Sequence, residues 1–392
     1  MIPLSLPHLN GNEWLYVKEC LDTGWISSAG NYVTLFEAAV AQQSGSPYGS
    51  ACINGTAGLH LSLICSGVQP GDHIIVPNLT FVASLNAISH AGASPIMIDI
   101  NSGDWQMDLH LLSGFLSEQT EIRDDGYTYF KKTGHKIKSI MPVHVLGNMG
   151  NMERLMSLAS QYNLDIIEDS TEALGSTYKG KQAGSFGKFG IFSFNGNKII
   201  STGGGGVVVS QEENLIQKVK HLSSQAKISA DIYDHDEVGY NYRMVNILAA
   251  VGLAQMEQFP AHLSIKKKID KFYREELEGV GDIVFQTVRE GVDPNCWLFT
   301  FRTNYSVSLL NFLTENGIQC RPFWKPMNQL IMYKDFHYEQ SADISERVYQ
   351  EGISIPSSVG MTSDELEKVT KYIKLYYKNN GVKNKNNSLS FL

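Results

Sequence analysis

The chain has 392 residues, of which 43% are hydrophobic and 18% charged, and its formal net charge is −8. This length and composition are typical of a globular protein with two domains. The acidic balance argues against a broad nucleic-acid surface, which would need clustered Lys and Arg. No apolar run reaches the length of a membrane span. We therefore expect neither a nucleic-acid nor a membrane partner.

The five cysteines are scattered, odd in number, and form no C-x-x-C pair. Reduced thiols in a cytoplasm are the simplest interpretation, and no metal site is expected. The first residues, MIPLSLPHLNGNEW, lack the charged start and apolar core of a signal peptide. A cytoplasmic location is the resulting prediction.

Residues 50–210 alternate between short β-rich runs and helical stretches. We expect strands over 73–77, 95–100, 137–144, 164–169, 189–194 and 205–210. Apolar residues recur at helical spacing over 56–67 and 152–163. The polar segment 117–136 is expected to be a surface insertion. This alternation predicts an α/β sheet with helices on its faces, whose ligands bind beyond the carboxyl ends of the strands.

The C-terminal part has a different pattern. Residues 211–275 are mostly helical, and Pro260 is expected to interrupt that helix. Beyond them we expect strands over 299–304 and 353–356 and helices over 306–317 and 363–379. These elements predict a large domain over 1–258, whose first residues pack near the small domain, and a smaller α/β domain over 259–378. The last residues, 379–392, are rich in Asn and Lys and are expected to be disordered.

Lys198 lies in the stretch FGIFSFNGNKIISTGGGG, residues 189–206. Ile199 and Ile200 follow it, and a buried amine tends to be neutral because desolvation disfavours its charged form. A neutral amine is what attacks an aldehyde or ketone to form a Schiff base. The glycines allow a cofactor to approach the backbone closely. The alternative is a lysine at a strand end whose amine reaches back to solvent.

Three other segments carry weaker signals. The run NGTAGLHLSL (54–63) places Thr56 at a helix start, which is either a phosphate site or a plain cap. Phe81 follows the strand at 73–77 and is either a stacking partner for a planar ring or a core residue. Asp169 ends the strand at 164–169 and either pairs with a protonated ring nitrogen or caps a helix, with Glu172 completing a capping box.

Together these segments provide what pyridoxal 5'-phosphate (PLP) needs. They offer a helix start for its phosphate, an aromatic side chain for its ring face and a carboxylate for its ring nitrogen. Ser193 and a glycine loop flank the lysine that would bind its aldehyde carbon. The protein would orient the cofactor while the cofactor carries the carbanion chemistry.

Six ordered motifs resemble the DegT/DnrJ/StrS family of PLP-dependent nucleotide-sugar aminotransferases. They are NGTAGLHLSL, VPNLTFVASLNAI, PVHVLGNMGNM, IEDSTEALGS, FSFNGNKIISTGGGG and GYNYRMVNILAAVGLAQME. The resemblance runs from the first residues to about residue 375. It implies a fold-type-I, aspartate-aminotransferase-like architecture, with a mixed, mostly parallel sheet in the large domain and a smaller C-terminal α/β domain.

The resemblance also implies roles around the cofactor ring. Lys198 matches the lysine that forms the Schiff base and moves the proton between cofactor and sugar carbons. Asp169 matches the partner of the pyridine nitrogen, and Phe81 matches the stacking aromatic. Glu172 matches the residue near the ring oxygen, where the family often has His or Gln. A carboxylate beside that oxygen implies that one of the two carries a proton.

Further matches concern the phosphate and the assembly. Thr56, Ala57 and Ser193 match phosphate ligands. Asn241 matches an asparagine that reaches the phosphate of the neighbouring subunit's cofactor. The resemblance therefore implies a homodimer with active sites at its interface.

Two departures point to a branch of the family. Asn195 and Gly204 stand where the family often has the His of FSFH-x-x-K and the Glu of TGEGG. With CRPFWKPMNQ (320–329), they resemble the branch that aminates C4 of nucleotide-linked 4-keto-6-deoxy sugars, including enzymes of the legionaminic-acid and bacillosamine pathways. The branch implies L-glutamate as amino donor, 2-oxoglutarate as its product and a UDP-linked 2-acetamido-2,6-dideoxy-hexos-4-ulose as substrate. Such reactions belong to the synthesis of bacterial surface glycans such as lipopolysaccharide.

Two segments are candidates for the sugar nucleotide. Trp25 and Ser27 lie in GWISSAG, a segment that approaches the sugar in relatives. Arg321, Trp324 and Lys325 are candidates for the nucleotide or its pyrophosphate, because Arg and Lys pair well with phosphate. The alternative for these three is a packed turn of the small domain.

Three other functions stay open on the sequence. A PLP-dependent dehydratase would share the fold, although that branch has His where this chain has Lys198. A non-catalytic sensor or regulator would keep the fold, but the chain shows neither a DNA-binding appendage nor a lost lysine. The third is an α/β scaffold with a structural lysine.

Overall fold

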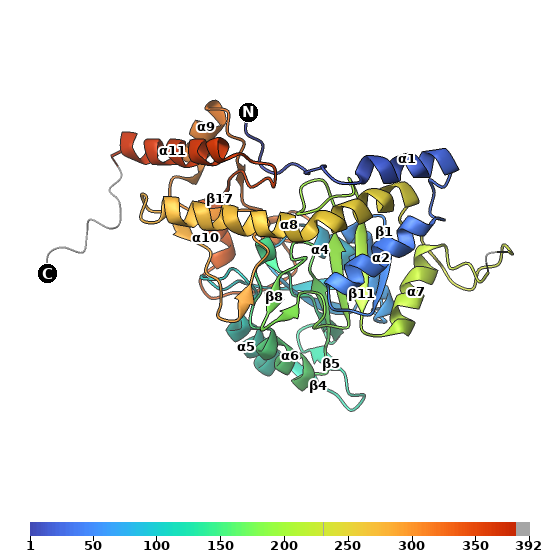
Figure 1. Ribbon diagram of the computed structural model, residues 1–392. Helices are drawn as coiled ribbons and strands as arrows, with labels where there is room; N and C mark the ends of the chain where they lie inside the picture. Colours follow the sequence, from blue (N-terminus) through green and yellow to red (C-terminus); the bar gives the residue numbers. More distant parts are fainter. Residues whose placement is uncertain (230, 382–392) are drawn as a thin grey trace.

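The structure is a computed structural model that describes residues 1–229 and 231–381 (Figure 1). Of the disordered tail expected over 379–392, residues 382–392 lie outside the described part of the chain. Asn379 is the last residue of the C-terminal helix.

A large, mostly parallel sheet forms the centre of the molecule. Its strands follow the order β1-β11-β10-β7-β6-β2-β3-β16, and the neighbours from β10 to β16 pair in parallel. Strand β11 pairs antiparallel with both β1 and β10. The strands in chain order are β1 Tyr48–Cys52, β2 His73–Pro77, β3 Ser94–Ile98, β6 Lys136–Ile140, β7 Asp165–Asp169, β10 Phe189–Ser193, β11 Gly206–Ser210 and β16 His337–Glu339. The predicted mixed, mostly parallel sheet is confirmed.

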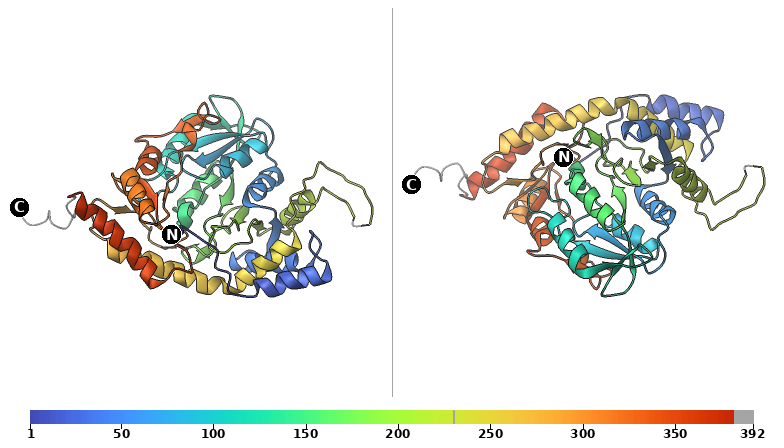
Figure 2. Two further views of the ribbon diagram at one scale, coloured as in Figure 1. Left: turned by 90° about the horizontal axis from the view of Figure 1, so that it is seen from above. Right: turned by 90° about the horizontal axis from the view of Figure 1, so that it is seen from below.

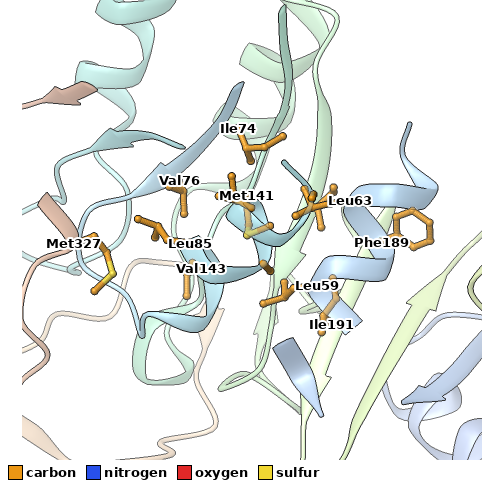
Figure 3. Close-up of a cluster of buried hydrophobic side chains, with 14 of the residues drawn as sticks. Leu59, Leu63, Ile74, Val76, Leu85, Met141, Val143, Phe189, Ile191 and Met327 are labelled. Carbon is orange, nitrogen blue, oxygen red and sulfur yellow. The ribbon is translucent and has the colours of Figure 1, made fainter. Parts of the chain in front are cut away.

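Helices cover both faces of this sheet because its strands are apolar on both sides. Ile74 and Val76 of β2 pack with Leu59 and Leu63 on one face (Figure 3), while Ile75 packs into a separate core on the other. Alternate side chains of a strand point to opposite faces, so one apolar run supplies both cores. The helices around the sheet are α1 Glu13–Thr23, α2 Asn31–Gln43, α3 Gly55–Cys65, α4 Ala83–His90, α5 Leu109–Gln119, α6 Met152–Gln161 and α7 Glu213–Ser223.

The polar segment 117–136 extends the sheet. Its strands β4 Thr120–Ile122 and β5 Thr128–Phe130 form an antiparallel hairpin, and β5 pairs with the edge of β6. Residues 121–127 are exposed, as expected for a surface insertion.

Helix α8, Asn246–Leu277, is one continuous helix of 32 residues. It runs along the molecule from α1 and α2 towards α11 (Figure 2). The expected interruption at Pro260 is wrong, because Pro260 lies inside the helix. Proline has no backbone N–H, so one carbonyl in the preceding turn of the helix lacks its donor. Pro260 is exposed, so water can bond that carbonyl instead. Phe259 and His262 are buried and anchor the other side of the helix.

A second, four-stranded antiparallel sheet lies in the C-terminal part. It has the order β12-β14-β17-β15. A separate core joins it to the second half of α8 and the later helices. The elements are β12 Val284–Phe285, β14 Thr300–Arg302, α9 Ser306–Glu315, β15 Arg321–Pro322, α10 Ile344–Glu351, β17 Gly352–Ser354 and α11 Ser363–Asn379. Three short strands, β8 Thr177–Tyr178, β9 Lys181–Gln182 and β13 Val292–Asp293, form a third sheet.

Contacts cross between the N-terminal and C-terminal parts of the chain in both directions. Ile2 bridges to Ile318 and packs in the C-terminal core. In the other direction, β16 joins the edge of the central sheet beside β3. The division into 1–258 and 259–378 stays a prediction, and α8 runs through that boundary without a break.

Candidate active site

A cavity of about 270 Å³ opens beyond the carboxyl ends of β7 and β10. The N-terminus of α3 and the segment after β2 complete its walls. Seven of the residues singled out in the sequence line it: Thr56, Phe81, Asp169, Glu172, Ser193, Lys198 and Trp324. The structure thus brings together residues from five separate motifs at the predicted edge of the sheet.

Lys198 projects into this cavity from a turn that follows β10. Ile199 and Ile200 anchor the turn in the core between the sheet, α2 and α8. The Lys198 side chain is 12% exposed, and its Nζ lies 3.5 Å from Oε1 of Glu172. Burial lowers the pKa of Lys198, while the carboxylates of Glu172 and Asp169 oppose that shift. A lysine whose amine reaches back to solvent is therefore the wrong alternative.

Glu172 is the second buried ionisable group. Its Oε2 accepts a hydrogen bond from the backbone N–H of Leu146 at 2.8 Å. Burial raises the pKa of Glu172 to about 7, against the opposing effects of Lys198 and the Leu146 N–H. Near neutral pH this carboxyl group can thus take up or release a proton beside the lysine amine.

Asp169 lies at the end of β7 and is held by side-chain donors. Ser84 Oγ donates to Oδ2 at 2.7 Å, and Thr171 Oγ1 donates to Oδ1 at 2.7 Å. The helix-cap alternative is wrong, because residues 170–176 contain turns and no helix. The Glu172 carboxyl group instead accepts the Leu146 N–H and lies beside the amine of Lys198. Such an orienting network holds the carboxylate in one position at the cavity wall.

The N-terminus of α3 lies against the end of β10. Asn54 is the N-cap, and its side-chain oxygen accepts the N–H of Ala57 at 2.8 Å. The plain-cap alternative for Thr56 is therefore wrong, since Thr56 lies inside the first turn. A Cβ on Gly55 would meet Ser193 Cβ at 3.0 Å, so a larger residue would have to push the two segments apart by a few tenths of an ångström. Gly55 and Thr56 line the cavity, whereas the Ala57 N–H is already bonded to Asn54.

Three aromatic rings line the cavity. Phe81 is 54% exposed, so the core-residue alternative is wrong. Its ring meets Trp324 edge-on at 6.3 Å between centroids, and Trp324 stacks on Trp297 at 6.4 Å. Planar ring faces at these positions suit a flat heteroaromatic ligand.

The structure places Trp25 and Ser27 elsewhere. Trp25 is 58% exposed and lines a different cavity of about 460 Å³ beside Tyr32 and Asn246. The Ser27 carbonyl accepts the N–H of Asn246 at 2.6 Å. Their role at the sugar stays a prediction.

Asn241, Arg321 and Lys325 are exposed and do not line the Lys198 cavity within the described chain. Asn241 forms a β-bridge with Ser224, and Arg321 begins β15. Their predicted roles towards a neighbouring subunit and a nucleotide stay predictions.

Four residues of the site escaped the sequence analysis: Asn54, Ser84, Thr171 and Trp297. Asn54 carried a readable signal, because Asn is a favoured cap just before a glycine-led apolar helix. Ser84 lies in the motif VPNLTFVASLNAI, but nothing local marks it as a partner of Asp169, and nothing local marks Trp297. Only the tertiary structure shows that the Trp297 ring centre lies 3.8 Å from Lys198 Nζ.

These residues fit PLP. The cavity offers a largely buried amine, a carboxylate oriented by two hydroxyl groups, a helix N-terminus with a glycine approach and an exposed aromatic ring. Each matches one part of that cofactor: aldehyde, ring nitrogen, phosphate and ring face.

The DegT/DnrJ/EryC1/StrS aminotransferase family matches the chain over residues 7–374. The chain belongs to this family. It is 37% identical to a GDP-perosamine synthase of Escherichia coli O157:H7, covering 96% of this chain and 98% of that one. It is 36% identical to EpsN of Bacillus subtilis, assigned as a pyridoxal phosphate-dependent aminotransferase, over 95% of each chain.

A solved structure agrees with these relatives. A Streptococcus pneumoniae protein assigned as a sugar aminotransferase, in its PLP form, superposes with a TM-score of 0.85. It is 26% identical, and the match covers 96% of this chain and 99% of that one. This DegT/DnrJ/EryC1/StrS protein is therefore a PLP-dependent aminotransferase of fold type I that acts in nucleotide-sugar metabolism.

Among the described residues, no helix is long and apolar enough to span a membrane. The cytoplasmic location stays a prediction.

Proposed function

We propose that this enzyme transfers the amino group of L-glutamate to C4 of a nucleotide-linked 4-keto-6-deoxy sugar. The observation that carries the proposal is the largely buried amine of Lys198 in one cavity with two carboxylates and a helix N-terminus. Membership of the family supports the reaction type, and the sequence motifs support C4 as the position.

Different residues of the cavity would hold different parts of the cofactor. The start of α3 at Thr56, together with Ser193, faces the cofactor phosphate. Asp169, held by Ser84 and Thr171, keeps the ring nitrogen protonated. Phe81 lies against the ring face. When bound, PLP supplies the electron sink that allows a carbon next to the amino group to lose a proton.

Lys198 moves the proton. Its Nζ would hold the cofactor when no amino group is loaded, and as a free amine it would carry the proton during transfer to the sugar. Burial lowers the pKa of Lys198 and so favours its neutral amine. The nearby Glu172 provides a carboxylate that stabilises the charged amine when a proton has been taken up.

The proposal also concerns which nucleotide, GDP or UDP, carries the sugar. The motifs favoured a UDP-linked acetamido sugar, whereas the Escherichia coli relative at 37% identity is named for a GDP-linked sugar. We therefore place a GDP-linked 4-keto-6-deoxy sugar first and the UDP-linked acetamido sugar second.

The test is incubation of the purified protein with L-glutamate and a panel of GDP- and UDP-linked 4-keto-6-deoxy sugars, followed by mass spectrometry. The expected product carries an amine in place of the keto oxygen, with one 2-oxoglutarate formed for each amine. A deoxy sugar without nitrogen would identify a dehydratase instead. Absence of turnover with every sugar would favour a sensor or regulator on the same fold.

Lys198→Ala should lower turnover about 10³-fold, because both cofactor attachment and proton transfer use this amine. Borohydride reduction followed by peptide mass mapping should attach PLP to Lys198 in the wild type and not in the variant. Lys188→Ala is the matched control, since Lys188 pairs with Asp165 at the opposite end of β7 and β10. A K198A protein with normal turnover would refute the assignment.

A further inference from the structure

Trp297 covers the amine of Lys198. Its ring centre lies 3.8 Å from Nζ, and the Trp297 side chain is almost fully buried at 3% exposure. The residue comes from the segment between β13 and β14, about 100 residues after the lysine in the sequence. An ammonium at this distance from a ring face is attracted by the negative charge of the π system.

Hydrogen bonds fix the indole in this position. Its Nε1–H donates to the carbonyl of Asn197, the residue before the lysine, at 2.7 Å. The backbone N–H of Trp297 donates to Oδ1 of Asn295 at 3.0 Å, and the Trp297 carbonyl accepts from Nζ of Lys266 at 2.7 Å. The same Asn295 side chain donates to the Glu172 carbonyl at 2.8 Å. One connected set of bonds therefore ties the Trp297 ring to the backbone of Asn197 and of Glu172.

We infer that Trp297 is a positioning residue that holds the free amine of Lys198 over its ring face and favours the ammonium form there. The inference rests on the proposed role of Lys198 as the proton carrier. In that role the amine leaves the cofactor and must stay near the reacting carbons while it carries a proton. A fixed aromatic face stabilises the charged amine without adding a further carboxylate to the cavity.

Two carboxylates and burial also affect the protonation of the Lys198 amine. Glu172, on the turn after β7, lies 3.5 Å from Nζ, and Asp169 at the end of β7 also favours the charged form. Burial acts in the opposite direction. Removing the ring should therefore shift the balance towards the neutral amine while both carboxylates stay in place.

The test measures protonation of Lys198 in the protein without PLP, by competitive acetylation at several pH values and peptide mass spectrometry. In Trp297→Leu the pH midpoint of Lys198 labelling should fall by about one unit relative to the wild type. Lys266 provides an internal control, because it is 2% exposed and bonds the Trp297 carbonyl. Lys266 should resist acetylation in W297L as it does in the wild type if the backbone at residue 297 has not moved.

A second variant separates the ring face from packing. Replacing Trp297 with a tetrafluorinated tryptophan keeps its shape and its N–H but removes most of the negative charge from the face. Its Lys198 midpoint should fall as in W297L. An unchanged midpoint in the fluorinated protein overturns the inference, whether or not W297L folds. Because no sugar or glutamate takes part, this result is independent of the substrate proposal.

Discussion

Two carboxylates three residues apart serve the site differently because their surroundings differ. Asp169 is met by donors from Ser84 and Thr171 on both oxygens. Glu172 has one backbone N–H, from Leu146, and the amine of Lys198. Burial therefore dominates at Glu172 and raises its pKa to about 7. Environment, rather than residue type, makes the two carboxylates chemically different.

Glu172→Gln should remove a pH dependence near 7. Below about pH 7 the wild-type carboxyl is protonated, and above it the negative charge supports the ammonium form of Lys198. Glutamine keeps an acceptor for the Leu146 N–H but mimics the protonated form at every pH. We expect wild-type kcat/KM to fall below pH 7, and E172Q to stay flat from pH 6 to 8 at a rate about tenfold below the wild-type plateau.

Steady-state rates across this pH range, with the nucleotide sugar varied, measure the effect. Glu153→Gln is the control, because Glu153 pairs with Lys179 on the surface away from the cavity. Superimposable pH profiles of wild type and E172Q would show that Glu172 does not titrate in the reaction.

At the scale of elements, the start of α3 combines a structural and a binding role. Asn54 caps the helix through the Ala57 N–H and also lines the cavity. Gly55 and Thr56 then present the first turn to a ligand. The helix N-terminus attracts an anion, so a charge placed at the cap competes directly with a phosphate.

Two substitutions at Asn54 should separate these roles. Asn54→Ala removes the cap and should lower the free energy of unfolding of the protein without PLP by about 1 kcal/mol. Asn54→Asp keeps a cap but adds a negative charge, and should weaken PLP binding about tenfold with little change in stability. Urea unfolding and PLP titration measure the two quantities. Equal PLP affinity of N54D and the wild type would place the phosphate elsewhere.

At the scale of the whole molecule, some predicted site residues lie outside the Lys198 cavity. Asn241, Trp25 and Arg321 are all exposed. Their positions agree with the proposal of a homodimer in which Asn241 reaches the phosphate of the neighbouring subunit. In such a dimer, residues absent from one subunit's cavity are supplied by the other.

Mixing two inactive variants tests this assembly. If Asn241 serves the neighbouring site, a dimer of one K198A and one Asn241→Ala subunit has one intact site. After subunit exchange, an equal mixture should recover roughly a quarter of wild-type turnover. Sedimentation of each protein at the assay concentration establishes the oligomeric state. No recovery in a mixture of confirmed dimers would place Asn241 in its own subunit's site.

The sequence predicted the repeating α/β pattern and the cofactor residues that follow its strands. Runs such as HIIVP are mostly apolar and become strands that are buried at every position. The Lys198 stretch combines an apolar strand, a turn and a glycine loop, a local pattern with a direct chemical meaning. The prediction at Pro260 failed because a local helix breaker was outweighed by packing on both sides of it.

By itself, the sequence determined the family and the cofactor and predicted the lysine, because each depends on short segments whose residue types carry the chemistry. Only the tertiary structure decided what surrounds that lysine. Trp297 contacts the turn of Lys198 from 100 residues away in the sequence, and Ser84 contacts Asp169 from 85 residues away, so both positions depend on long-range packing. The protonation of Glu172 likewise follows from burial, a property that no local pattern specifies.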